Sequence, residues 1–154
     1  MDVEKLDGGA GYGYNVYGVG TMTYFTGRSG SALTYGDGSG VKDGLLKLPA
    51  QTIQYADNCD VKASSFGKGY SYIYPQYKVD GDRRQVFAAG NVARGGNIHF
   101  RHGGTAGVCW ADGHVTSEKY VRPSANSTAA CIAAKVGTFG PDDTSLWDPW
   151  DLVL

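Results

Sequence analysis

Residues 97–117 read NIHFRHGGTAGVCWADGHVTS, and this stretch carries the strongest folding signals in the chain. Asp112-Gly113 lies between two strand-like segments. This pair favours a two-residue hairpin, because a type I′ turn needs positive φ at both central positions. Gly103-Gly104 marks a second, looser turn. Together the two turns predict a three-stranded meander.

The spacing of the two turns also predicts a register for the meander. A first loop at 103–106 would place Phe100 opposite Cys109, and the second turn would place Trp110 opposite Val115. Because side chains alternate along a strand, the residues of the meander divide between two faces. The face opposite to that of Trp110 would carry Ile98, Phe100, His102, Cys109, Ala111 and His114.

The three histidines of the stretch, with Cys109 and Asp112, suggest a metal-ligand set at first sight. In the predicted register, His102 lies roughly 13–16 Å from Asp112 and His114, at about 3.3 Å per residue. Zinc needs its ligands within about 2.0–2.3 Å of one point. We therefore interpret the histidines as groups that hydrogen-bond nearby backbone and cap loops.

Length and composition indicate one domain, residues 1–154, with a single modest core. The 24 glycines and 11 tyrosines indicate many turns and aromatic strand faces. Fourteen basic residues oppose fifteen acidic ones, for a net charge of -1. This balance excludes the electrostatic footprint expected of a protein that binds nucleic acid or anionic lipid.

Cys59, Cys109 and Cys131 are too few and too far apart for a disulfide scaffold or a zinc ribbon. In an oxidising compartment one disulfide could form, and the sequence leaves all three pairings open. Cys109 lies between Val108 and Trp110 in a strand-like run, so we expect it to be a core thiol.

Other segments complete the expected α+β fold, which is mainly antiparallel β. Residues 52–56 read as a strand that closes at Asp57-Asn58. One helix is predicted over 128–136, with Ser127 as N-cap and Gly137 as the stop. We expect Trp147 of the C-terminal tail to be tucked against the domain.

Three motifs together resemble the prepilin-type processing-associated His-x9-Asp-Gly domain of pseudopilin-like proteins. The first is His102, nine further residues, then Asp112-Gly113; the second is Tyr12-Gly13-Tyr14-Asn15; the third runs from Pro49-Ala50-Gln51-Thr52-Ile53 to Asp57. They span about two-thirds of the chain in the expected order. The motif residues are Tyr14, Asn15, Asp57, His102, Asp112 and Gly113.

The resemblance implies a pilin-like globular head with a β-meander and one short helix. Such subunits carry a leader that a prepilin peptidase cleaves, and an apolar N-terminal helix that anchors them in the inner membrane. The sequence lacks that long helix, so we expect a soluble head that meets the membrane only through the missing helix. Its expected location is the periplasm or cell surface, and its expected partners are other pseudopilin or pilin subunits and the secretion machinery.

The resemblance also raises a calcium hypothesis, because major pseudopilins of type II secretion systems bind calcium in a C-terminal loop. Asp142, Asp143 and Asp148 could supply oxygen ligands, although their spacing matches no EF-hand loop. The alternative is that Asp142 and Asp143 are solvated turn residues after Pro141.

Two function classes other than a structural subunit are also compatible with parts of the sequence. A secreted glycan-binding β module would use Tyr70, Tyr72, Tyr74 and Trp147 as a stacking platform. An enzyme finds little support, because no nucleophile elbow, His-Glu-x-x-His helix or phosphate-binding loop is present. Asp57 and His102 could still form an acid-base pair in space. We expect a non-enzymatic structural protein.

Overall fold

The structure is a computed structural model that describes residues 11–15, 19, 46–61, 66–70, 72–73, 77–80, 83–86, 96–123, 127–141 and 146–147. Its helical elements are the 3-10 turn η3 (Pro49–Gln51) and the helix α2 (Ala129–Ala133). Its strands are β1 (Tyr12–Asn15), β2 (Ile53–Asp60), β3 (Tyr72–Ile73), β4 (Tyr77–Asp80), β5 (Arg83–Val86), β6 (Gly96–His99), β7 (Thr105–Trp110), β8 (Val115–Lys119), β9 (Arg122–Pro123) and β10 (Val136–Thr138).

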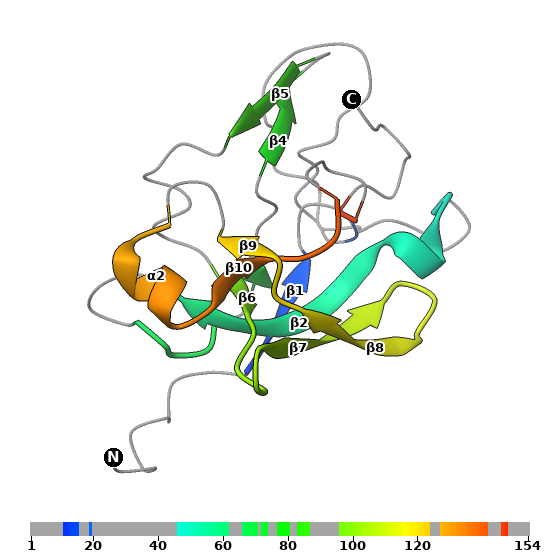
Figure 1. The fold of residues 1–154 in the computed structure, drawn as a ribbon. Coiled ribbons are helices and arrows are strands. Elements are labelled where there is room, and N and C mark those ends of the chain that lie inside the picture. The colour runs from blue at the N-terminus through cyan, green and yellow to red at the C-terminus, as the bar shows by residue number, and fades with distance from the viewer. Residues whose placement is uncertain are drawn as a thin grey trace.

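Eight of the described strands form one sheet in the order β8-β7-β2-β1-β3-β6-β10-β9, and β4 and β5 pair separately as a hairpin. β2 lies at the centre and is antiparallel to β1, β6 and β7 (Figure 1). β3 is parallel to both β1 and β6, so the sheet is mixed. The expectation of a mostly β chain with a short helix, in the α+β class, is confirmed for the described residues.

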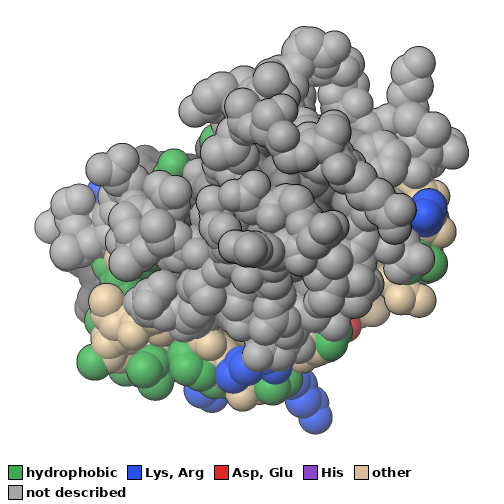
Figure 2. Space-filling model, turned by 90° about the horizontal axis from the view of Figure 1, so that it is seen from above, with side chains coloured by type: hydrophobic (Ala, Val, Ile, Leu, Met, Phe, Trp, Pro, Cys, Tyr) green, Lys and Arg blue, Asp and Glu red, His purple; other side chains and the backbone are tan. Residues whose placement is uncertain are grey.

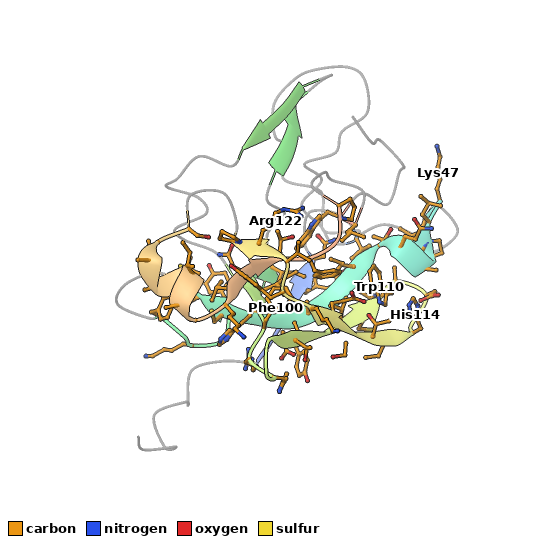
Figure 3. All side chains as sticks on the ribbon, viewed as in Figure 1. Lys47, Phe100, Trp110, His114 and Arg122 are labelled. Atoms are coloured by element: carbon orange, nitrogen blue, oxygen red, sulfur yellow. The ribbon has the colours of Figure 1, made fainter. Side chains whose placement is uncertain are left out.

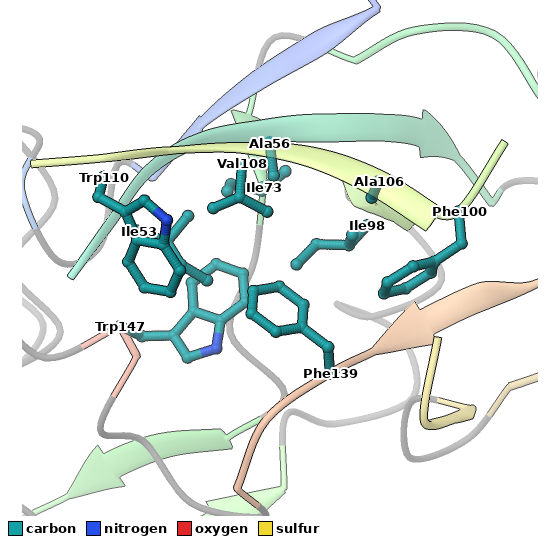
Figure 4. Close-up of a cluster of buried hydrophobic side chains, with 10 residues drawn as sticks. All are labelled: Ile53, Ala56, Ile73, Ile98, Phe100, Ala106, Val108, Trp110, Phe139 and Trp147. Atoms are coloured by element: carbon teal, nitrogen blue, oxygen red, sulfur yellow. The ribbon is translucent and has the colours of Figure 1, made fainter. Parts of the chain in front are cut away.

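Alternation along β7 builds the core. Ala106, Val108 and Trp110 are buried and the residues between them are half-buried, as in a strand with one face on the core. Figure 4 shows the core side chains packed between the β2–β7 pair and β10. As expected, Trp147 is tucked in, with 5% of its surface exposed. The cluster comprises Ile53, Ala56, Ile73, Ile98, Phe100, Ala106, Val108, Trp110, Phe139 and Trp147.

The type I′ turn lies at Gly103-Gly104 and not at Asp112-Gly113. Gly103 and Gly104 have φ values of 66° and 95°. The flanking residues His102 and Thr105 exchange backbone hydrogen bonds of 3.1 and 3.2 Å. These are the features of a two-residue hairpin loop, which the sequence led us to expect at the other turn.

The turn at Asp112-Gly113 has a three-residue loop. The Gly113 amide donates to the Trp110 carbonyl at 2.9 Å, the Trp110 amide donates to the His114 carbonyl at 3.0 Å, and Gly113 has φ of 91°. This is a turn followed by a glycine bulge. The predicted register is therefore wrong by one residue: Cys109, not Trp110, lies opposite Val115. Trp110 faces the core, whereas Val115 is 70% exposed.

The predicted three-stranded meander is also wrong in its first half. β6 pairs with β2 and β10, and in the described structure no ladder joins β6 to β7. Instead, both strands pair with the long strand β2. β7 pairs with the first half of β2, and β6 pairs with its second half. β2 does not close at Asp57-Asn58 as expected but continues to Asp60, because the Asp57 and Asn58 side chains find partners inside the fold.

The helix is shorter than predicted and has different caps. Thr128, not Ser127, is the N-cap, and its hydroxyl accepts the Cys131 amide at 3.3 Å. At the other end Lys135, with φ of 53°, takes the left-handed position expected of Gly137. Gly137 instead lies in β10, where an added Cβ would come 2.3 Å from a β9 carbonyl oxygen.

All three cysteines are free thiols, and the expectation that Cys109 is the core thiol is wrong. Cys109 alternates with the buried Val108 and therefore points to the other face of the sheet. Cys59 and Cys131 are the buried pair, and they share a small cluster with Val136. Burial raises the pKa of the Cys59 thiol to about 11.

No helix among the described residues is long and apolar enough to cross a membrane.

Gly13 in β1 offers a direct test of this packing. A Cβ there would lie 2.1 Å from Nδ2 of Asn58 and 2.8 Å from the backbone carbon of Tyr72. Because these atoms belong to packed strands, we expect Gly13→Ala to lower the free energy of unfolding by about 1–3 kcal/mol, measured by urea denaturation.

Gly11→Ala is the matched control for Gly13→Ala. Its Cβ would meet only the flexible end of Arg101, at 3.0 Å. We expect it to change stability by no more than about 0.5 kcal/mol. Equal losses in the two variants would contradict this description of β1.

Candidate functional site

The side chain of Asp57 is the meeting point of the candidate site. It comes from the middle of β2, and its carboxylate is 3% exposed. Oδ2 accepts the Gly107 backbone amide at 2.7 Å and lies 3.2 Å from Nε2 of His102. Oδ1 lies 3.5 Å from Nε of Arg101. A buried carboxylate is costly unless it is paired and hydrogen-bonded, and both oxygens are engaged here.

The loop between β6 and β7 brings these partners to Asp57. The hairpin tip at Gly103-Gly104 turns the chain back, and the Thr105 hydroxyl donates to the His102 carbonyl at 2.7 Å. Arg101 extends the other way: its guanidinium donates to the Gly11 carbonyl at 3.0 Å and also to the Asn58 carbonyl. The loop is therefore fastened to β2 and to the start of β1.

The second motif segment, β1, pairs with β2 and begins opposite Asp57. Asn15 is fully buried, and its side-chain amide donates to the Ile53 carbonyl at 2.8 Å. The Tyr14 hydroxyl donates to the Val19 carbonyl at 3.1 Å. Burial, and to a lesser extent the neighbouring Tyr55, raises the pKa of Tyr14. Tyr14, Asn15, Asp57 and His102 thus all lie on or against β2.

Asp112 and Gly113 lie elsewhere, at the far end of β7. Oδ1 of Asp112 accepts the His114 amide at 3.1 Å and contacts Nδ1 of His114 at 2.5 Å. These hydrogen bonds lower the pKa of Asp112. The His114 ring stacks on Trp110 with centroids 5.6 Å apart, and Figure 3 shows both side chains at this end of the sheet. The His-x9-Asp-Gly motif is therefore divided between two places.

The possible metal ligands are separated in the same way. His102 contacts Asp57, His114 contacts Asp112, and Cys109 lies near the Trp110 end of β7. Within the described residues, no group of three or more His, Cys, Asp or Glu side chains could hold a metal ion. The calcium candidates Asp142, Asp143 and Asp148 lie outside the described residues.

The structure also places the four aromatic residues of the glycan-binding alternative. Trp147 belongs to the core and cannot form part of a surface platform, so that choice is wrong. Tyr72 is exposed and contacts the Tyr70 ring edge-on, with centroids 6.0 Å apart. Tyr74 lies outside the described residues.

Two residues that matter here escaped the sequence analysis. Asn58 is fully buried and holds the segment before β3: its amide donates to the Tyr70 and Tyr72 carbonyls at 2.5 and 3.0 Å, and its Oδ1 accepts the Tyr70 amide at 3.2 Å. Arg101, directly before the motif histidine, pairs with Asp57.

The contacts of Asp57 resemble those of a structural cluster more than those of a catalytic site. A carboxylate within hydrogen-bond reach of an imidazole is a geometry that acid-base catalysis uses. Here, however, the same oxygen also accepts a backbone amide, and the other oxygen faces a guanidinium that is itself bonded to two carbonyls. The contacts made by this cluster join chain segments to one another.

Comparisons with known proteins add no assignment. No protein-family model matches the chain, no curated protein matches its sequence, and no solved structure matches its fold. The motif residues and their positions in the structure therefore carry the functional argument.

His99, next to this cluster, predicts a pH dependence of stability. Burial, reinforced by the nearby Arg101, lowers the pKa of His99 below the usual value of about 6.5, and its Nδ1 has no hydrogen-bond partner in the structure. As the pH falls through about 6.5, the unfolded chain binds a proton that folded His99 resists, so stability is lost on the acid side.

We therefore expect the free energy of unfolding to fall from pH 7 to pH 5.5, and to fall less steeply in His99→Gln. Urea denaturation at a series of pH values measures both slopes. His102 and His114 remain in the variant and serve as internal controls. Identical slopes in the two proteins would show that His99 is not the group responsible.

Proposed function

We propose that this chain is the extracytoplasmic head of a pseudopilin-like subunit, a non-enzymatic structural protein of a type II secretion or type IV pilus-like system. One observation carries the proposal: Asp57, from the third motif, contacts His102, from the first, at 3.2 Å. The sequence suggested that these two residues could pair in space, and their contact supports reading the motifs as parts of one folding unit.

The second motif supports the same interpretation. Tyr12, Gly13 and Tyr14 of β1 lie opposite Asp57, Ala56 and Tyr55 of β2. Asn15 fixes the far end of this pairing through the Ile53 carbonyl. A set of motifs that builds the central strands is what a head domain needs if it is to present its surface to neighbouring subunits.

The acid-base alternative is less well supported. Both oxygens of the Asp57 carboxylate are held by partners from β7 and the loop before it. His102 is 60% exposed, and its contact with Asp57 anchors the hairpin tip. The proposal therefore gives this pair a structural role.

In the proposed system, the precursor carries a prepilin leader and an apolar helix ahead of the head. That helix anchors the subunit in the inner membrane and later packs into a pseudopilus. The head lies in the periplasm or at the cell surface, and its partners are other pilin-type subunits and the secretion machinery. Calcium binding by Asp142, Asp143 and Asp148 remains a separate part of the proposal.

Processing in the native host tests the proposal. The complete reading frame, tagged at its C-terminus, is expressed in the host and in the same host without its prepilin peptidase. We expect a shorter tagged protein when the peptidase is present, recovered in the membrane fraction and cross-linked to other pilin-type subunits. A product of the same size in both hosts, without such partners, would contradict the proposal.

Asp57→Ala is a useful control in that experiment. The variant weakens the head but leaves the leader untouched. We expect it to be cleaved as the parent protein is and to accumulate to a lower level. This separates a defect in folding from a defect in processing.

A further inference from the structure

Tyrosines form a row across the face of the sheet that points away from the core. Tyr72, Tyr14 and Tyr55 lie directly opposite one another on β3, β1 and β2. Residues opposite one another share a face, and the neighbours Asn15, Ile73 and Ala56 are buried on the other side. Beyond Tyr55 the same row continues through Cys109 to the exposed Val115.

The rings on this face are open to solvent. Tyr12, Tyr55 and Tyr72 are 58%, 41% and 39% exposed. The Tyr14 and Tyr55 rings lie against each other with centroids 5.0 Å apart and planes inclined by 38°. Gathered exposed aromatic side chains mark binding surfaces. The core side chains of Figure 4 lie on the other side of β2 and β7. Figure 2 is a view from that core side, so the tyrosine face is turned away from the reader in it.

Polar groups border the tyrosines on one side. Tyr12 lies directly opposite Asp57. Gly107 leaves room between them, since an added Cβ would lie 3.3 Å from the Asp57 carboxylate and 3.9 Å from the Tyr12 ring. His102 and Arg101 complete this border and pair with Asp57. Asp57 is 3% exposed and both of its oxygens are engaged, so the groups that this border presents to a ligand are the exposed parts of His102 and Arg101. The charges of Arg101 and Asp57 oppose each other, so the border has no strong net charge.

This combination fits a neutral sugar chain better than the other ligand classes. The hydrogen-rich face of a sugar ring packs on an aromatic ring, and its hydroxyls need hydrogen-bonding groups at the side. Anionic ligands would find Asp57 beside Arg101. A peptide that added a strand would need an open sheet edge, whereas β3, β1 and β2 are interior strands.

The spacing of the rings indicates how the sugar would lie. Adjacent strands are about 4.8 Å apart, so Tyr55 and Tyr72, two strands apart, are separated by roughly 10 Å. That separation is comparable to the length of a disaccharide in an extended, β-linked chain. We propose that this face binds a neutral, β-linked oligosaccharide that runs across the strands, with sugar rings on Tyr55 and Tyr72 and hydroxyls directed to Tyr12, His102 and Arg101.

Isothermal titration with cellohexaose and chitohexaose tests the proposal, with maltohexaose, an α-linked chain that coils, as the contrasting ligand. We expect binding of at least one β-linked chain and much weaker binding of maltohexaose. Tyr55→Ala and Tyr72→Ala should each weaken binding by about tenfold or more, because each removes one stacking ring. Tyr55→Phe keeps the ring and should bind nearly as the parent protein does.

Ile132→Ala is the matched control, since it removes an exposed apolar side chain from α2, away from this face. It should bind as the parent protein does. Should an alanine variant fail to fold, amide chemical-shift changes at Tyr12, Tyr55 and Tyr72 of the parent protein, titrated with the same sugars, decide the matter. Changes gathered at these residues support the site, and changes elsewhere overturn it.

Three results would overturn the proposal: no binding of either β-linked chain, equal binding of maltohexaose, or alanine variants that bind like the parent. A fourth would be self-association of the parent protein, lost in Tyr55→Ala, without sugar binding. That result would make the face a contact between copies of the chain. The sugar site does not depend on the pilin-type assignment, and its failure would leave the processing experiment unaffected.

Discussion

The carboxylate of Asp57 places a negative charge inside the sheet, with 3% of the side chain exposed. A charge in that position is stable only when paired, and its partners come from the loop between β6 and β7 and from β7 itself. The Gly107 amide, His102 and Arg101 satisfy it. The loop must therefore return to β2 before β7 begins, and this return sets where β7 enters the sheet.

Several features of the fold follow from that constraint. β2 passes through Asp57 and Asn58 as a continuous strand because both side chains are satisfied within the fold. Asn58 then fixes the chain at β3, and the absence of a side chain at Gly13 lets β1 approach it. The tyrosine row lies on the same face of β1 and β2 as Asp57, since Tyr12 is directly opposite Asp57. The motif centre and the proposed sugar surface are therefore neighbours on these two strands: the first consists of buried contacts and the second of exposed rings.

The sequence predicted the local features better than the long-range ones. The positions of both turns and the short helix near 128–136 were recognisable because each depends on neighbouring residues. The burial of Trp147 was recognisable because a large aromatic side chain favours the core whatever its partners are. The lengths of the two loops were predicted the wrong way round, since glycine pairs and Asp-Gly pairs each occur in loops of more than one length. Lys135 replaced the expected glycine at the helix end because the chain must turn there to start β10. Asp57-Asn58 looked like a strand end, since their partners lie between 12 and 50 residues away along the chain.

The claim that Asp57 holds the loop to β2 is tested most directly by urea unfolding of Asp57→Ala beside His102→Ala. We expect Asp57→Ala to lower the free energy of unfolding by roughly 1–3 kcal/mol, because it leaves the Gly107 amide without its acceptor and Arg101 without its ion-pair partner. His102→Ala should cost less, since that side chain is 60% exposed and its contact with Asp57 is weakened by solvent. An Asp57→Ala protein as stable as its parent would contradict the account.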